Sequence, residues 1–194
     1  RHDWSSTHKE LCGQTIPLLA SGRVDVEWIN VFVAAVAGRL NPERPLETWC
    51  AADAPAWQVI SCLYHVLGAF DAGRIRYPEP ELLYQRLQDL HWDEAPENEP
   101  RTVCTDGDWA WLLLRLSAQL PQHAETCLQA IRRVSERRVH AWHNNRRNIL
   151  CLDTHHLFCY LWSTAVFQSC IREHYVGGFV RDTLNDPALF RIQA

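Results

Sequence analysis

The chain has 194 residues, of which 47% are hydrophobic and 22% charged, and its formal net charge is −4. This composition excludes an intrinsically disordered chain, and the absence of a basic excess disfavours a nucleic-acid binder. We therefore expect a single globular domain over residues 1–194.

Apolar residues recur at helical spacing along the first half of the chain, and no segment shows the alternation of a strand. The second expected helix is apolar almost all round, which predicts a central position. Gly22 and Gly73 are expected to end the first and third helices. The expected helices cover residues 7–22, 24–40, 55–70 and 80–90.

Residues 93–108 are expected to form an acidic loop, because Pro96 and Pro100 interrupt any helix there. Asp106 or Asp108 would then cap a helix from Trp109 to Leu120.

The last third of the chain predicts two long helices. Pro121 suits the first turn of a helix that runs to about residue 144. Asp153 is expected to cap an uncharged helix over residues 154–172, which predicts a buried position. The fold class is therefore all-α, a single-domain bundle of about seven or eight helices with a central apolar helix near 154–172. Histidine, serine and glutamine side chains within the uncharged run argue against a membrane span.

The eight cysteines include no Cys-x-x-Cys pair, and several fall in apolar helical segments. A chain of this length with an ample core does not need a disulfide framework. We expect free, buried thiols, a reducing cytoplasmic location and no cofactor.

One group of residues has the side chains of a metal site. It comprises His140, His143, Cys151, His155 and Cys159. The two histidine positions at i, i+3 and the His155 and Cys159 positions at i, i+4 each share a helix face, and zinc accepts both ligand types. The alternative is a core thiol with hydrogen-bonded histidines. A metalloprotein or enzyme built on this group is the second hypothesis for function.

Charges of opposite sign are separated along the chain. Arginine dominates residues 132–147, whereas acids dominate residues 89–108. Two interpretations stay open: the two segments are solvated or neutralise one another, or the acids form a docking surface. The candidate partner-binding residues are Asp89, Asp93, Glu94, Glu97, Glu99, Asp106 and Asp108.

Short motifs between residues 153 and 175 are similar to a known pattern. They are Asp153-Thr154-His155, Tyr160-Leu161-Trp162-Ser163, Ala165-Val166 and Arg172-Glu173-His174-Tyr175. This segment resembles the C-terminal helical region of bacterial immunity proteins of the PoNi type, which neutralise polymorphic nuclease toxins. The chain departs from that pattern after Trp-Ser, where it has Thr164 and Ala165 in place of a glutamate.

The resemblance implies an all-helical, non-enzymatic cytoplasmic protein that binds a cognate basic toxin in a stoichiometric complex. It would act as a monomer or homodimer, without nucleic acid or membrane. A helical pocket for an apolar ligand or haem, suggested by the aromatic content, is a third hypothesis.

Overall fold

The structure is a computed structural model, and it describes residues 14–39, 54–94, 102–144 and 154–170. These residues form α-helices, two short 3-10 helices and turns, without a strand among them, which confirms the all-α bundle. The α-helices are α2 (Ile16–Ala20), α3 (Val26–Arg39), α4 (Ala56–Ala72), α5 (Pro80–Asp89), α6 (Thr102–Gln119), α7 (Ala124–Asn144) and α9 (Thr154–Cys170). The 3-10 helices are η3 (Trp92–Glu94) and η4 (Pro121–His123).

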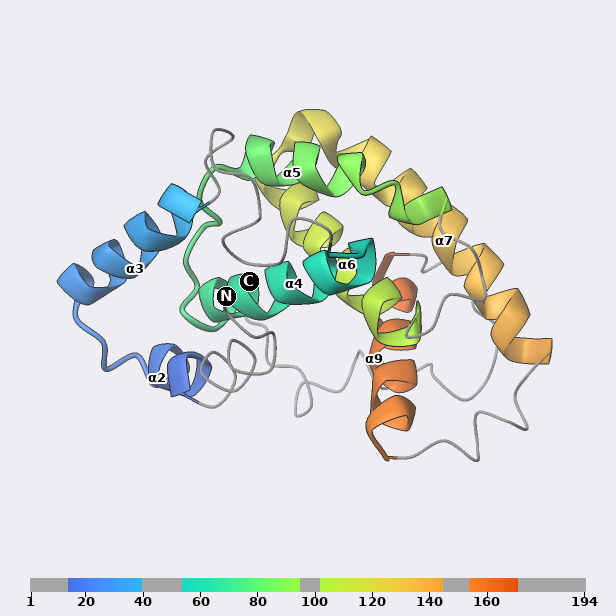
Figure 1. Ribbon diagram of the computed structural model, residues 1–194, viewed down its shortest axis with the longest axis horizontal. Coiled ribbons are helices and arrows are strands. Elements are labelled where there is room, and N and C mark those ends of the chain that lie inside the picture. Colours follow the sequence, from blue (N-terminus) through green and yellow to red (C-terminus); the bar gives the residue numbers. More distant parts are fainter. Residues whose placement is uncertain (1–13, 40–53, 95–101, 145–153, 171–194) are drawn as a thin grey trace.

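Helix α6 is the centre of the bundle, since it packs against α4, α5, α7 and α9 (Figure 1). Its core-facing side chains are large and apolar, and Trp109, Leu112 and Leu113 are almost completely buried. From α4, Ile60 and Phe70 enter the same core. Removing this much apolar surface from water is the main force that holds the helices together.

Helices α4 and α5 lie close to where the sequence predicts them. Pro55 precedes α4 and Gly73 ends it, as expected from a residue without a helical N–H and a residue favoured at helix ends. Pro80 begins α5, and Leu83 and Leu87 form its buried stripe. Gly22 follows α2 with a φ of 65°, a conformation that glycine adopts without steric cost.

Helix α6 begins at Thr102, so the expected loop over residues 93–108 is wrong for its last seven residues. Gly107, which looked like a loop residue, lies where α6 crosses α9. A Cβ at this position would lie 3.0 Å from the Cα of Ser163. Glycine therefore allows the two helices to approach closely inside the bundle.

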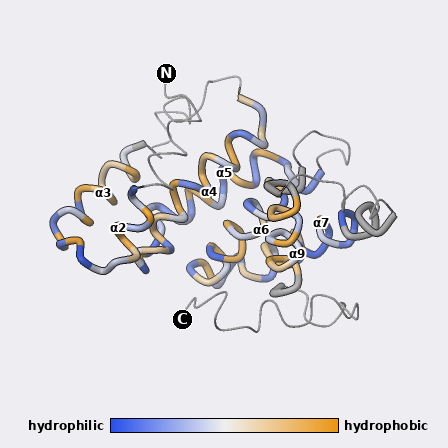
Figure 2. The backbone as a smooth tube through the Cα atoms, turned by 90° about the horizontal axis from the view of Figure 1, so that it is seen from below, coloured by the Kyte–Doolittle hydropathy of each residue, from blue (hydrophilic) through white to orange (hydrophobic). Residues whose placement is uncertain are grey.

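Helix α3 lies at the edge of the molecule with α2, so the expectation of a central helix is wrong (Figures 1 and 2). Only one side of α3 joins the core. There the ring of Phe32 packs against that of Phe70, with the ring centroids 5.1 Å apart. Its other side leaves Val26 and Val31 71% and 65% exposed.

Helix α9 packs against α6 and α7. Its second half is buried from Ser163 to Phe167, as the apolar run predicts. Its first half differs, because one side of that half faces solvent.

A disulfide bond joins Cys104 at the start of α6 to Cys159 in α9, with the Cα atoms 4.8 Å apart. The expectation that the cysteines are thiols is therefore wrong for this pair, whereas Cys62 and Cys127 are buried thiols outside any disulfide. None of the helices in the described residues is long and apolar enough to cross a membrane.

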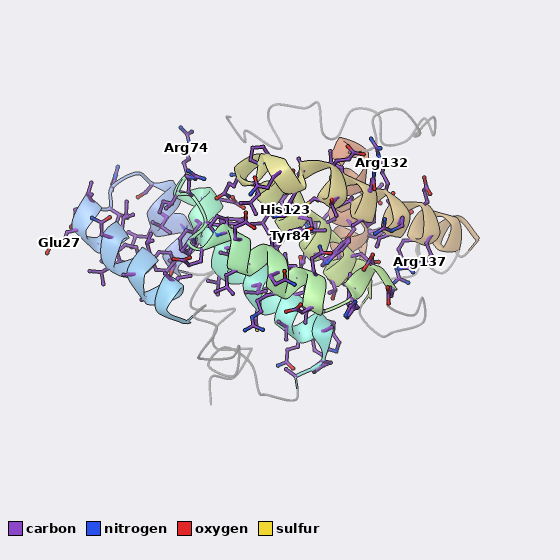
Figure 3. All side chains as sticks on the ribbon, turned by 90° about the horizontal axis from the view of Figure 1, so that it is seen from above. Glu27, Arg74, Tyr84, His123, Arg132 and Arg137 are labelled. Atoms are coloured by element: carbon purple, nitrogen blue, oxygen red, sulfur yellow. A yellow bond between two sulfur atoms is a disulfide. The ribbon has the colours of Figure 1, made fainter. Side chains whose placement is uncertain are left out.

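A smaller polar contact fastens η4 to α5. His123 stacks on Tyr84 with the ring centroids 4.2 Å apart, and its Nε2 lies 3.0 Å from Glu81 Oε2 (Figure 3). Gln122 donates a second hydrogen bond to the same carboxylate.

Candidate functional site

Asp106, one of the seven candidate acids, lies in the core and not on a surface patch. Its side chain is completely buried, with Oδ2 2.8 Å from Nε of Arg138 and Oδ1 accepting a hydrogen bond of 2.9 Å from the Trp92 indole. These contacts tie η3, α6 and α7 together. Arg138 is buried as well, so one residue of the arginine segment is an internal partner of one acid.

Burial destabilises the charged form of the Asp106 carboxylate, whereas the neighbouring arginines stabilise it. Burial raises the pKa of this carboxyl to about 6, although Arg138, the Trp92 hydrogen bond and Arg137 each act to lower it. Within the described residues the two Nη atoms of Arg138 have no hydrogen-bond acceptor. Asp106 is therefore the residue that makes the burial of this guanidinium tolerable.

Asp108 is also buried, only two residues further along α6, and its surroundings are different. Its Oδ2 accepts a hydrogen bond of 3.1 Å from Ser61 Oγ on α4. Burial raises the pKa of this carboxyl well above its ordinary value of 3.8, and the Ser61 hydroxyl opposes the rise only in part. Asp108 is thus a core residue whose burial favours the protonated form, and the assignment of both acids to a surface patch is corrected.

The described acids that remain of the candidate patch, Asp89, Asp93 and Glu94, lie around the end of α5 and η3. Asp93 forms an ion pair of 2.9 Å with Arg133 of α7, and Asp89 lies 3.8 Å from Arg86. Glu94 is exposed. Glu97 and Glu99 lie outside the described residues. The acidic and arginine segments therefore touch one another, which supports the interpretation that they are partly neutralised within the fold.

The described arginines of α7 do not form one solvent-exposed face, because Nε and Nη2 of Arg137 are buried, as is Arg138. Arg132 and Arg137 are five residues apart and leave α7 on different sides (Figure 3). Arg133 is 60% exposed even with its partner Asp93.

The candidate metal group loses a ligand, because the sulfur of Cys159 is bonded to Cys104 and cannot act as a thiolate. His140, His143 and His155 lie on α7 and α9, but their side chains, like Cys151, are outside the described residues. Among the residues that the structure describes, no three histidine, cysteine or acidic side chains could hold a metal ion.

The sequence did not single out Asp71, which is the hub of a polar network between α4 and α6. Its Oδ1 accepts a hydrogen bond of 2.7 Å from Nε of Arg115. Its Oδ2 accepts bonds of 2.8 Å from the Trp111 indole and 2.9 Å from the Tyr77 hydroxyl. Burial, followed by the charge of Asp71, raises the pKa of Tyr77 well above its ordinary value of 10.0. We call these four residues the Asp71 network. A single acid at the end of an apolar helix gives no sequence signal for it.

The surface of α9 has the features of a contact site. Leu157, Phe158 and Leu161 are 36%, 65% and 47% exposed, and their spacing places them on neighbouring positions of one helix face. The opposite side of the helix is fixed by the Cys104–Cys159 bond and by packing on α6. The sequence predicted a core position for these side chains because they are apolar. Apolar character alone does not show which side of α9 the other helices cover.

A comparison of the chain with family models, with curated protein sequences and with solved structures gives no match.

Proposed function

We propose that this protein is a non-enzymatic protein-binding module that neutralises a toxin through direct, stoichiometric contact. The observation that carries the proposal is the exposed apolar face of α9, formed by Leu157, Phe158 and Leu161. The segment that resembles immunity proteins of the PoNi type, residues 153–175, contains this face.

A binding surface gains affinity when its anchors are held in place before the partner arrives. Helix α9 meets this condition, since Gly107 permits close packing on α6 and the disulfide at Cys159 fixes the same turn. Phe158 directly precedes Cys159 in the chain and is the most exposed of the three. Large side chains of this kind supply most of the affinity in protein complexes when a partner buries them.

Charge has a secondary role in this proposal. Among the described residues, the candidate acids at the surface are Asp89, Asp93 and Glu94, and Asp93 is already paired with Arg133. Exposed acids of this kind act mainly on the rate of encounter with a basic partner. A basic toxin, with a nuclease as one example, therefore stays the proposed partner class, and the apolar face supplies the affinity.

The Cys104–Cys159 bond bears on the compartment. Structural disulfides persist in oxidising environments and are rare in the cytoplasm. This bond therefore weighs against the expected cytoplasmic location and favours an oxidising compartment.

The first test is affinity capture from the native host with immobilised protein. Leu161→Asp and Phe158→Asp should each abolish capture of the specific partner, because a charge replaces an apolar anchor. Leu18→Asp is the matched control, since Leu18 is 45% exposed, against 47% for Leu161, and belongs to α2, a helix that lies beside α3 and away from α9 (Figure 1). Capture that survives both α9 variants would contradict the proposed surface.

The second test uses the captured partner in purified form. Titration calorimetry should give a one-to-one complex, and co-expression with the wild-type chain should rescue cells from the partner's toxicity, whereas Phe158→Asp should not. A partner that is harmless to cells would remove the toxin-neutralising part of the proposal and leave the binding module.

The third test addresses the electrostatic attraction of a basic partner by the acidic segment. Reversal of Glu94, Glu97 and Glu99 to lysine should leave the circular dichroism spectrum unchanged and slow association at low salt. An unchanged association rate would show that this acidic segment has no part in the encounter.

A further inference from the structure

Two adjacent arginines of α7 carry buried N–H groups that no acceptor among the described residues satisfies. The atoms are Nε and Nη2 of Arg137 and the two Nη atoms of Arg138. Arg138 is 1% exposed as a whole, whereas Arg137 is half-buried. Buried polar groups in folded proteins nearly always have a hydrogen-bond partner, so these four nitrogen atoms require an explanation.

Both guanidinium groups act on one carboxylate, that of Asp106. Nε of Arg138 lies 2.8 Å from its Oδ2, and the charge of Arg137 is a further cause that lowers the pKa of Asp106. The Trp92 indole occupies Oδ1. Two positive charges therefore share at most one negative charge among the described residues. A buried charge without a counter-charge strongly destabilises a fold, so this arrangement favours an additional anion.

The unsatisfied atoms form two edges that suit an oxyanion. Nε and Nη2 are neighbours along one side of the Arg137 guanidinium, and Nη1 and Nη2 form the end of the Arg138 guanidinium. Each edge can donate two parallel hydrogen bonds to two oxygen atoms of a carboxylate or a phosphate. A carboxylate engages only one edge in this way, whereas a phosphate has oxygen atoms for both. A water molecule accepts such hydrogen bonds as well, but it leaves the excess positive charge uncompensated.

We propose that Arg137 and Arg138 bind a phosphate group, either as the free ion or at the end of a small molecule. Arg137 leaves α7 on a different side from Arg132 and is half-buried, so it forms the side of the site nearer to solvent (Figure 3). Arg138 forms the inner side, where Asp106 holds it through Nε and leaves the Nη end for the ligand. The apolar face of α9 takes no part in this site, so failure of this proposal leaves the proposed function untouched.

Titration calorimetry of the full chain with inorganic phosphate tests the proposal. Because the ion is small, we expect one ion per chain with a dissociation constant between about 10 µM and 1 mM. Sodium chloride at matched ionic strength is the control for general salt effects. Acetate should bind about tenfold more weakly than phosphate or worse, because it engages only one guanidinium edge.

Methyl phosphate distinguishes the two sources of the phosphate group. Affinity similar to that of inorganic phosphate indicates a group at the end of a small molecule, and much weaker affinity indicates a site for the free ion.

Substitution of Arg137 separates a binding role from a structural one. Arg137→Gln should weaken phosphate binding about tenfold or more, because it removes one charge and one bidentate edge. Arg137→Lys keeps the charge without the edge and should recover binding only in part. In phosphate-free buffer Arg137→Gln should melt at or above the wild-type temperature, since an uncompensated charge is removed. Arg132→Gln, the same change at an exposed arginine of α7, is the matched control and should bind phosphate like the wild type.

A wild-type chain that binds phosphate no more tightly than chloride would overturn the proposal, as would equal phosphate affinity of the wild type and Arg137→Gln. Acetate binding as tight as that of phosphate would overturn the assignment to a phosphate group. Strong destabilisation by Arg137→Gln in phosphate-free buffer would also overturn the proposal, because an acidic side chain of the same chain would then already satisfy the two arginines.

Discussion

Replacement of Asp108 by asparagine should make the protein more stable at neutral pH. Asp108 is 6% exposed and sits in α6, where it accepts one hydrogen bond from Ser61. Because burial raises its pKa well above 3.8, the folded protein holds this proton to higher pH than the unfolded chain does. Asparagine keeps the size of the side chain and its acceptor for Ser61, and it needs no proton.

The magnitude follows from the reference pKa. An unfolded-state carboxyl with a pKa of 3.8 is about three pH units below neutrality, and one unit corresponds to about 1.36 kcal/mol, so protonation at pH 7 costs at most about 4 kcal/mol. An extra buried N–H of asparagine without an acceptor costs about 1–2 kcal/mol. The net expectation for Asp108→Asn is a gain of at most about 2–3 kcal/mol at pH 7, which should disappear near pH 4.

The sign of the pH dependence is specific. Because the folded-state pKa values of Asp106 and Asp108 are raised, their contribution to stability is fully present below about pH 4 and is lost as the pH rises through the folded-state values. For Asp106 the window runs from about 3.8 to about 6 and corresponds to roughly 3 kcal/mol. Asp108→Asn should remove its own part of this slope and leave that of Asp106.

Urea denaturation followed by tryptophan fluorescence, at pH values from about 4 to 8, measures these differences. Asp106→Asn is the informative comparison, since it should destabilise by about 3–5 kcal/mol at pH 7 through the loss of Arg138's charge partner. Asp89→Asn, on the surface, should change stability by less than about 0.5 kcal/mol. The reasoning would be refuted by an Asp108→Asn protein that is less stable than wild type at pH 7 and has the same pH slope.

Four further perturbations have defined outcomes. Gly107→Ala should lower the melting temperature, with a loss of about 1–3 kcal/mol from the clash with α9, whereas Gly38→Ala should gain about 0.5–1 kcal/mol by helix propensity alone. Reduction of Cys104–Cys159, which closes a loop of 55 residues, should cost up to about 4 kcal/mol, and peptide mapping should show both cysteines protected from alkylation until a reductant is added. Asp71→Ala should destabilise by about 2–4 kcal/mol in urea denaturation, because it strands the donors of the Asp71 network; a change below 0.5 kcal/mol would show that water replaces them.

The pattern of apolar residues was sufficient for most of the helices. Helical spacing, prolines at the first turn and glycines at the ends place α4, α5 and α7 within a few residues of their positions in the structure. These signals are local, because they depend on backbone geometry and on which side of a single helix is apolar. The all-α class follows from them without knowledge of any neighbour.

The beginning of α6 shows where local signals fail. Asp106, Gly107 and Asp108 together indicate a turn when they are considered alone. In the fold, Arg138 pairs with Asp106, and α9 occupies the space beside Gly107. Ser61 donates a hydrogen bond to Asp108. Arg138, Ser163 of α9 and Ser61 are 32, 56 and 47 residues away from them in the chain, and no spacing rule connects them.

The candidate surface shows the same division. The sequence by itself determined that residues 154–171 form an uncharged helix and that acids and arginines are segregated. Only the tertiary structure decided that Asp106 and Asp108 are interior, that Phe158 and Val31 face outward, and that Cys104 meets Cys159. The physical reason is that helix formation depends on neighbours along the chain, whereas burial depends on which other helices arrive at the same place.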